Sequence, residues 1–171
     1  HAVTPLSAVQ SEYSMMERMF ERDVFPVCRQ LGIGFVAFSP LASGFLSGTV
    51  RADTAYRGDD VRRAISRFRP ENIAANQPLI DLLQRLAAEK GATPAQVSLA
   101  WMLAKQPFIV PIPGSRSRAR IAENFGAAEV AIAPGELAAI EAALARISIH
   151  GNRTDEDIAR MRHSPPNFGD T

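Results

Sequence analysis

Three arginines that follow a Pro-Gly turn form the part of the chain best suited to bind an anion. Phe108–Ile112 is expected to be a short strand, and Arg116, Arg118 and Arg120 are expected in the first turn of the next helix. A helix N-terminus has unpaired N–H groups and a partial positive charge, and forked guanidinium donors beside it suit a phosphate. The pattern favours a phosphorylated ligand, in particular a nucleotide. A solvated basic helix start is the alternative.

Two other strand ends carry residues that could complete such a site. Gln10 ends the apolar segment Leu6–Gln10, and its amide offers both a donor and an acceptor. Phe38 ends the apolar segment Ile33–Phe38 and is followed by Ser39–Gly44, whose small residues let backbone amides approach a pyrophosphate. From the residues alone, a polar strand terminus explains Gln10 equally well, and simple core packing is the favoured interpretation of Phe38.

Strands and helices alternate along the chain, which predicts an α/β protein with a parallel sheet. Of the three strands just described, the second is continuously apolar and is therefore expected to be buried on both faces. Residues 39–70 are expected to form a long loop, and residues 148–171 a tail with little core. The helices are expected at Glu17–Leu31 with an interruption at Pro26 and a left-handed cap at Gly32, Asn72–Lys90, Pro94–Lys105 with Thr93 as N-cap, Ser117–Asn124 and Pro134–Arg146.

The composition is that of an ordinary globular protein and argues against several classes of function. The 171 residues are 46% hydrophobic and 22% charged, and a net charge of +1 gives no global attraction for nucleic acid or an anionic membrane. No apolar run reaches the roughly 18 residues of a membrane span, and no signal peptide opens the chain. The single cysteine, Cys28, fits a core thiol and a reducing compartment. We expect a cytoplasmic protein and, because the chain starts at His1, a fragment or processed piece.

Several segments, in their order and spacing, resemble the aldo-keto reductase family. The resemblance runs from about Leu6 to about Ile147, and the ordered set is more specific than any one segment. Two segments are similar to the strand ends that hold nicotinamide and pyrophosphate in that family, and the last pair resembles its site for the adenosine 2′-phosphate and adenine. The segments are Gln10–Ser14, Val36–Leu46, Phe68–Asn72, Ala95–Leu103, and Ile112–Arg116 with Arg120–Asn124.

The resemblance implies a (β/α)8 TIM barrel of which this chain holds only the last three β/α units. A complete barrel needs about 250 residues, and a three-strand arc leaves two open parallel edges and an unfilled interior. Residues 1–147 are therefore expected to be the C-terminal half of a barrel, followed by the tail at residues 148–171. The first five strands are expected to be missing, cleaved or supplied by another chain.

The resemblance also implies NADP(H) as the cofactor and assigns its contacts residue by residue. Gln10 would pair with the nicotinamide carboxamide, and Phe38 would stack on the nicotinamide ring in place of the tyrosine that is common in the family. The remaining contacts would be Ser39, Pro40, Leu41, Ala42, Ser43 and Gly44 for the pyrophosphate, Gly114, Ser115, Arg116 and Arg120 for the 2′-phosphate, and Glu123 and Asn124 for adenine. Ser43 stands where many members of the family have arginine or glycine, so a long side chain on the pyrophosphate is not expected.

The activity implied by the resemblance is NADPH-dependent reduction of a small aldehyde or ketone to an alcohol. The family's catalytic Asp, Tyr, Lys and His come from the first half of the barrel. Here the tyrosines are Tyr13 and Tyr56 and the lysines are Lys90 and Lys105, and none of them is expected in a catalytic position. We therefore predict no catalytic residue and no metal site in this chain, which alone should bind nucleotide weakly and reduce nothing.

Two alternative functions stay open. One is a binding module of the same fold that senses NADP(H) without turnover. The other is an unrelated half-barrel that binds a sugar phosphate after its last strand, where barrels often hold phosphate groups.

Overall fold

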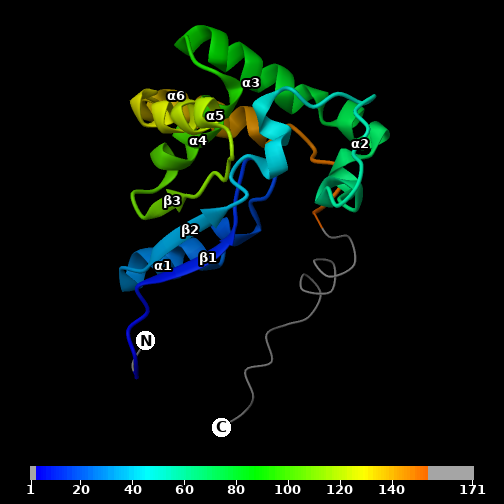
Figure 1. Ribbon diagram of the computed structural model, residues 1–171. Coiled ribbons are helices and arrows are strands. Elements are labelled where there is room, and N and C mark those ends of the chain that lie inside the picture. The colour runs from blue at the N-terminus through cyan, green and yellow to red at the C-terminus, as the bar shows by residue number, and fades with distance from the viewer. Residues whose placement is uncertain (1–2, 154–171) are drawn as a thin grey trace. The chain divides into compact units, whose positions relative to one another are not determined.

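The computed structural model describes residues 3–153 and divides the chain into two compact units (Figure 1). The larger unit comprises the chain up to Thr49 together with Pro78–Ile147, and the smaller one comprises Val50–Gln77 together with the segment that begins at Ser148. Residues 1–2 and 154–171, which include His1, His163 and most of the predicted tail, lie outside the described part.

A three-stranded parallel sheet forms the centre of the larger unit. Strands β1 (Ala8–Glu12), β2 (Gly34–Phe38) and β3 (Ile109–Pro111) lie in the order β1-β2-β3. Each pair of neighbours is parallel, with a helical crossover between the strands. The predicted α/β organisation is confirmed, although the first strand begins two residues later than expected and continues past Gln10.

The larger unit contains these complete helices: α1 (Val24–Leu31), α4 (Pro94–Lys105), α5 (Arg118–Gly126) and α6 (Pro134–Leu144). It also contains all but the first residue of α3 (Gln77–Lys90). The predicted caps are confirmed: Gly32 has a φ of 65°, and Thr93 forms a reciprocal capping box with Gln96. None of the described helices is long and apolar enough to cross a membrane.

Two predicted helices differ from the structure for local reasons. The helix expected at Glu17–Leu31 starts only at Val24, after a 3-10 turn at Met19–Glu21, and Pro26 lies in its first turn, where no N–H donor is needed. The helix expected at Asn72–Lys90 is two helices, α2 (Pro70–Ala75) and α3, which are separated at Asn76.

Strand β2 is packed on one face and not on both, contrary to the prediction. Phe35 and Ala37 are fully buried, whereas Val36 and Phe38 are half-buried. Tyr13, Phe25 and Trp101 fill the packed side, with ring centroids 5.0 Å apart for Tyr13–Phe25 and 5.5 Å apart for Tyr13–Trp101. The alternation follows because side chains of a strand point to opposite faces and the helices of this unit cover the face of Phe35.

The exposed edge of β3 is poor in hydrogen-bond donors. The amide of Ile112 donates to the carbonyl of Ala37 in β2 at 3.0 Å, so the amide positions of Pro111 and Pro113 face the opposite edge. Proline has no N–H, so this edge offers carbonyl acceptors but no donor at those two positions. A further strand could therefore form only part of the usual hydrogen bonds with this edge. The missing donors limit non-specific strand pairing there.

The smaller unit is made of short turns around helix α2. The predicted loop at residues 39–70 contains three 3-10 turns: Ala42–Ser47, which belongs to the larger unit, Val61–Arg63 and Ser66–Phe68. Within the smaller unit, Tyr56 lies against Phe68 with ring centroids 5.3 Å apart, and the Arg62 guanidinium lies 4.3 Å from the centroid of the Tyr56 ring.

Candidate functional site

Two loops with predicted functional residues leave the same edge of the sheet. The Cα partners Ala37 and Pro111 lie side by side near the ends of β2 and β3, and the carboxyl ends of parallel strands share one edge. The turn Ser39–Gly44 follows the first of these ends, and Gly114–Arg120 follows the second. The fold therefore places both predicted phosphate-binding segments at one end of the larger unit.

The turn Ser39–Gly44, called the post-β2 turn below, has a strained backbone. Ser39, Ala42 and Ser43 have φ values of 49°, 49° and 57°, in the left-handed region that residues other than Gly, Asn and Asp seldom adopt. Each such residue costs on the order of 1 kcal/mol, and such strain persists only where the surroundings impose it. The sequence carries no signal for this strain because none of the three residues is glycine.

Buried neighbours and internal hydrogen bonds hold this strained turn. Ala42, Phe45 and Leu46 are almost fully buried, and the 3-10 turn that contains them packs against α4. The Ala42 amide donates to the Ser39 carbonyl at 2.8 Å, and the Ser47 hydroxyl donates to the Gly44 carbonyl at 2.7 Å. Pro40 is buried, whereas Ser39, Leu41, Ser43 and Gly44 are half-buried and can be reached from solvent.

Gln10 and Phe38 lie on one face of the sheet, but Gln10 does not end its strand. Gln10 is the third of the five residues of β1 and pairs with Val36, whereas Glu12 pairs with Phe38. Side chains two residues apart share a face, so Gln10, Glu12 and Phe38 all face away from the packed side. Gln10 is exposed and Phe38 half-buried. The sequence pattern does not single out the buried Glu12 beside Phe38, because the apolar segment of the first strand ends at Gln10.

The arginine cluster, which is Arg116, Arg118 and Arg120, surrounds the start of α5. Ser117 is the N-cap, and its side chain accepts from the Arg120 amide at 3.5 Å, while its own amide donates to the Ser115 hydroxyl at 3.1 Å. The helix begins at Arg118, so the prediction that all three arginines lie in its first turn is wrong for Arg116. Arg116 precedes the cap because the serine, which bonds the backbone two or three residues ahead, sets the helix start.

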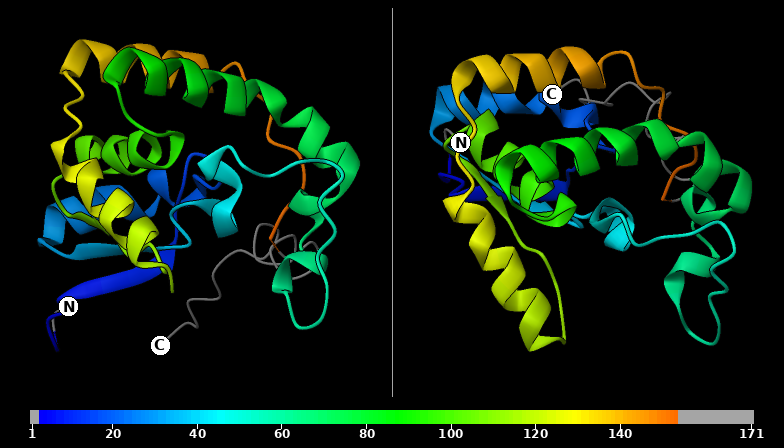
Figure 2. Two further views of the ribbon diagram at one scale, coloured as in Figure 1. Left: turned by 45° about the horizontal axis from the view of Figure 1, so that its top comes forward. Right: turned by 90° about the horizontal axis from the view of Figure 1, so that it is seen from above.

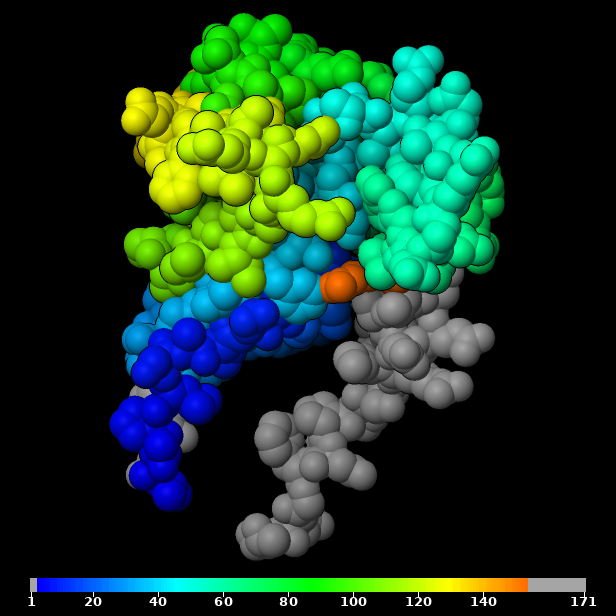
Figure 3. Space-filling model, viewed as in Figure 1, coloured from blue at the N-terminus to red at the C-terminus, as the bar shows by residue number. Residues whose placement is uncertain are grey.

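All three guanidinium groups are solvent-exposed. Figure 3 shows α5 on the surface of the larger unit, and Figure 2 shows it running back beside the stretch that follows β3. Within residues 3–153, none of the three side chains has a hydrogen-bond or ion-pair partner. The free donors of the cluster and the helix N-terminus make this the place in the larger unit best suited to an anion.

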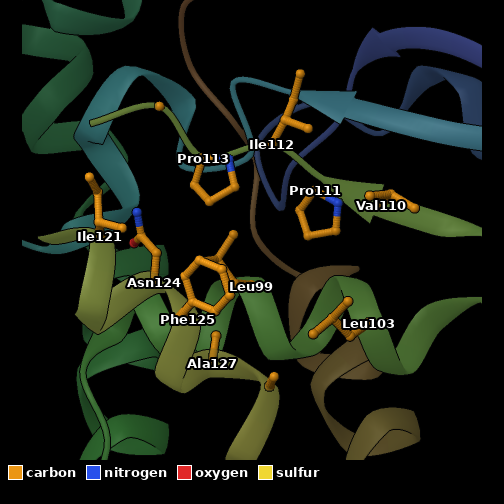
Figure 4. Close-up of a pocket in the computed structure, with 12 residues that line it drawn as sticks. Leu99, Leu103, Val110, Pro111, Ile112, Pro113, Ile121, Asn124, Phe125 and Ala127 are labelled. Atoms are coloured by element: carbon orange, nitrogen blue, oxygen red, sulfur yellow. The ribbon is translucent and has the colours of Figure 1, made fainter. Parts of the chain in front are cut away.

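An apolar groove of about 530 Å³ adjoins the arginine cluster. Gly114 and Asn124, two of the predicted cofactor residues, line it together with side chains from α4, β3 and α5. Figure 4 shows Ile121 and Asn124 at one end and Leu103 and Val110 at the other, with Phe125 and Leu99 between them. Glu123 is half-buried beside Asn124, and its backbone carbonyl accepts from Nε2 of the Gln96 side chain at 3.0 Å. A flat, largely apolar ring with polar edges suits such a groove.

Tyr13 is part of the core and is not placed to donate a proton to a ligand. It is fully buried, stacks on Trp101, and its hydroxyl donates to Glu21 Oε1 at 2.6 Å. Burial and then the hydrogen bond to Glu21 raise the pKa of Tyr13 far above its usual value. Tyr56 belongs to the smaller unit, where burial raises its pKa. The expectation that neither tyrosine is a catalytic acid stays a prediction.

The lysines and the cysteine are also engaged in structural roles. Lys90 pairs with Glu136, and Lys105 pairs with Glu141 at 2.8 Å. Cys28 is buried in α1, and burial raises the pKa of its thiol, which makes the thiol a poor nucleophile. Among the described residues, no group of three His, Cys, Asp or Glu side chains could hold a metal ion.

Comparison with known proteins finds a matching family model and solved structures with a similar fold. Residues 1–145 match the model of the aldo/keto reductase family. A glycerol dehydrogenase from Gluconobacter oxydans is 23% identical and superposes with a TM-score of 0.78 over 87% of this chain and 45% of that chain. A thermostable aldo-keto reductase in complex with the inhibitor epalrestat is 26% identical, with a TM-score of 0.54 over 80% of this chain and 39% of that chain. The chain thus spans less than half the length of both solved structures.

Proposed function

This chain belongs to the aldo/keto reductase family, and we propose that it is the NADP(H)-binding part of an oxidoreductase that reduces small aldehydes or ketones to alcohols. In this proposal the chain corresponds to the C-terminal half of a (β/α)8 barrel, and its three strands are the last three of that barrel. The observation that carries the proposal is the arginine cluster, whose exposed guanidinium groups lack partners within residues 3–153 and lie at the same sheet edge as the post-β2 turn.

The face of the sheet that carries Gln10 and Phe38 would hold the nicotinamide. The Gln10 amide is exposed and can both donate to and accept from a carboxamide, and the Phe38 ring gives a flat apolar surface beside it. Together these residues would orient the ring, which, when bound, supplies the hydride for carbonyl reduction. The small side chains of the post-β2 turn would let the pyrophosphate approach the backbone.

Arg116 and Arg120 of the arginine cluster would hold the adenosine 2′-phosphate and thereby select NADPH over NADH. Guanidinium groups bind phosphate in a bidentate manner, and Arg116 and Arg120 flank the capped start of α5. Gly114 and the Ser115 hydroxyl lie in the turn just before them. Glu123 and Asn124 follow one turn along the helix, and Asn124 lines the apolar groove, which would accept adenine.

The proton donor for the carbonyl oxygen would come from another part of the barrel. Both tyrosines and both lysines of the chain have structural partners, so we assign none of them to catalysis. A polypeptide that supplies the remaining strands is therefore the partner that we propose, in addition to the small carbonyl substrate. With the donor elsewhere, the 171-residue chain alone should bind NADPH but not turn it over.

Binding of NADPH and NADH to matched arginine variants tests this proposal. We expect Arg120→Gln to weaken NADPH binding about 10- to 100-fold, as for the loss of a charge-assisted contact, and to leave NADH binding unchanged. Arg118→Gln removes the same charge from the same helix turn and serves as the control, with less than about a threefold change from the lost charge alone. Nucleotide fluorescence titration or calorimetry would measure both. Equal losses in the two variants would remove the proposed 2′-phosphate contact.

The same cofactor contacts would also serve a second function, that of an NADP(H) sensor of the same fold without turnover. The two proposals differ in whether the barrel, once complete, reduces a carbonyl compound. NADPH oxidation monitored with a panel of aldehydes and ketones separates them, because steady turnover excludes a pure sensor. Binding of a sugar phosphate, together with no measurable affinity for the dinucleotide, would exclude both.

A further inference from the structure

The segment His150–Asn152, in the part of the chain predicted to be a tail, is held within the smaller unit by hydrogen bonds to its backbone. Asn76 is fully buried between α2 and α3. Its Oδ1 accepts from the His150 amide at 2.9 Å, and its Nδ2 donates to the His150 carbonyl at 2.8 Å. One side chain therefore satisfies both backbone groups of one residue, as a neighbouring strand would.

The Ser66 side chain likewise bonds both backbone groups of Asn152. The Ser66 hydroxyl accepts from the Asn152 amide at 2.9 Å and donates to the Asn152 carbonyl at 3.2 Å. The Arg67 amide lies 3.4 Å from the same carbonyl, and Asn72 Nδ2 donates to the Ser66 carbonyl at 2.8 Å, which holds the 3-10 turn in place. The hydrogen bonds from Asn76, Ser66 and Arg67 to this segment thus all involve its backbone atoms.

Glycine is required between these two residues. Gly151 has a φ of 75°, and a Cβ at this position would lie 2.7 Å from both the amide nitrogen and the Cα of Arg67. Such a contact is far inside van der Waals distance, and backbone atoms cannot move aside as a flexible side chain can. The close approach and the left-handed φ both exclude any side chain here.

We propose that Ser66, Asn72 and Asn76, here called the backbone clamp, form a binding site for a short peptide whose central glycine has a left-handed conformation. Its ligand is residues 150–152 of the same chain. Recognition is by backbone groups, so the side chains of His150 and Asn152 are dispensable, whereas Gly151 is not. Because the buried Asn76 amide would lose both partners if the segment left, segment and clamp should open together. This inference is independent of the proposed function.

Amide hydrogen exchange of the full chain, resolved by NMR, tests the clamp. In Asn76→Ala and in Ser66→Ala we expect the amides of both His150 and Asn152 to exchange about tenfold faster or more, because the segment opens as one unit. Gly151→Ala should release both amides. His150→Ala and Asn152→Ala are the matched controls on the ligand side and should retain the protection of the parent chain. The Leu99 amide in α4 reports whether each variant keeps the fold of the larger unit.

The controls make the outcome decisive. Protection lost in Gly151→Ala, but kept in both neighbouring variants, supports recognition of the backbone with an obligatory glycine. Equal loss in His150→Ala or Asn152→Ala would show that side chains hold the segment and would overturn the proposal. So would unprotected amides of His150 and Asn152 in the parent chain. Gly151→Ala changes the ligand and not the clamp, so it tests the proposal even if the substitution of buried Asn76 prevents folding.

Discussion

Two groups of cations in the larger unit have opposite environments. In the carboxylate network, which is Arg18, Glu21, Lys105 and Glu141, the Arg18 guanidinium bridges both carboxylates and Lys105 pairs with Glu141 at 2.8 Å. The indole N–H of Trp101 also donates to Glu141 at 2.7 Å. In the arginine cluster, the guanidinium groups have no such partner within residues 3–153. Paired, largely buried charge stabilises the fold, whereas exposed charge without a partner is available to a ligand.

The largest effect on stability is expected when Glu141, the acceptor shared by Arg18, Lys105 and Trp101, is removed from the carboxylate network. Glu141→Ala leaves the Trp101 N–H without its acceptor and leaves Arg18 and Lys105 with Glu21 as their remaining carboxylate, and we expect a loss of about 3 kcal/mol in the free energy of unfolding. Glu136→Ala is the matched control, because Glu136 is also on α6 and also pairs with a lysine, but is about half exposed. It should cost less than about 1 kcal/mol. Urea denaturation would measure both variants. Similar losses of stability in the two would contradict the proposed difference between the largely buried network and an exposed ion pair.

Ionic strength should act on the arginine cluster and much less on the network. Raising ionic strength from about 0.01 M to about 0.15 M shortens the Debye length from about 30 Å to about 8 Å. Because the cluster is exposed, NADPH affinity should fall several-fold. The urea midpoint should change little, since the network is mostly shielded from solvent. NADPH titrations and urea unfolding curves in the same two buffers would measure both effects. Salt-independent NADPH binding would argue against an exposed phosphate contact.

Acid should weaken the network while leaving the cluster charged. Burial would raise the pKa of Glu21, but hydrogen bonds from Arg18 and Tyr13 outweigh it, so that this pKa is lowered. A carboxyl group with a lower pKa in the folded state contributes stability above its unfolded pKa, about 4.3, and loses it as the pH falls through the folded value. Stability should therefore drop below about pH 4.3, and Glu21→Gln should flatten that part of the curve. An unchanged acid limb in the variant would contradict this role.

The smallest expected effect concerns strain in the post-β2 turn. Ser43→Gly removes the left-handed strain at φ 57°, and the greater flexibility of glycine in the unfolded chain offsets part of the gain. We expect a net stabilisation of about 0.5 kcal/mol by thermal or urea unfolding. Ser47→Gly, in the same 3-10 turn, loses a hydroxyl bonded to the Gly44 carbonyl and should destabilise instead. A loss of stability in Ser43→Gly would mean that the serine is not strained.

The local elements of the candidate site could be predicted because nearby residues determine them. Thr93 and Gly32 cap helices through contacts within a few residues, and alternating strands and helices with long crossovers imply parallel pairing. The start of α5 differs from the predicted one by about one residue, because Ser117 caps the helix from outside it and does not form its first turn. The roles of the site residues toward a cofactor stay predictions, which the arginine variants above will test.

The sequence by itself determined the order of the strands and helices and the place of the arginines after the last strand, because these depend on contacts between near neighbours. The family was indicated by the order and spacing of its motifs. Only the tertiary structure decided that Ser39, Ala42 and Ser43 adopt left-handed conformations, that Tyr13 is buried against Trp101, and that Asn76 binds the backbone of His150. Each of these depends on residues that lie far apart in the chain, and on the burial that their packing creates, which no local pattern encodes.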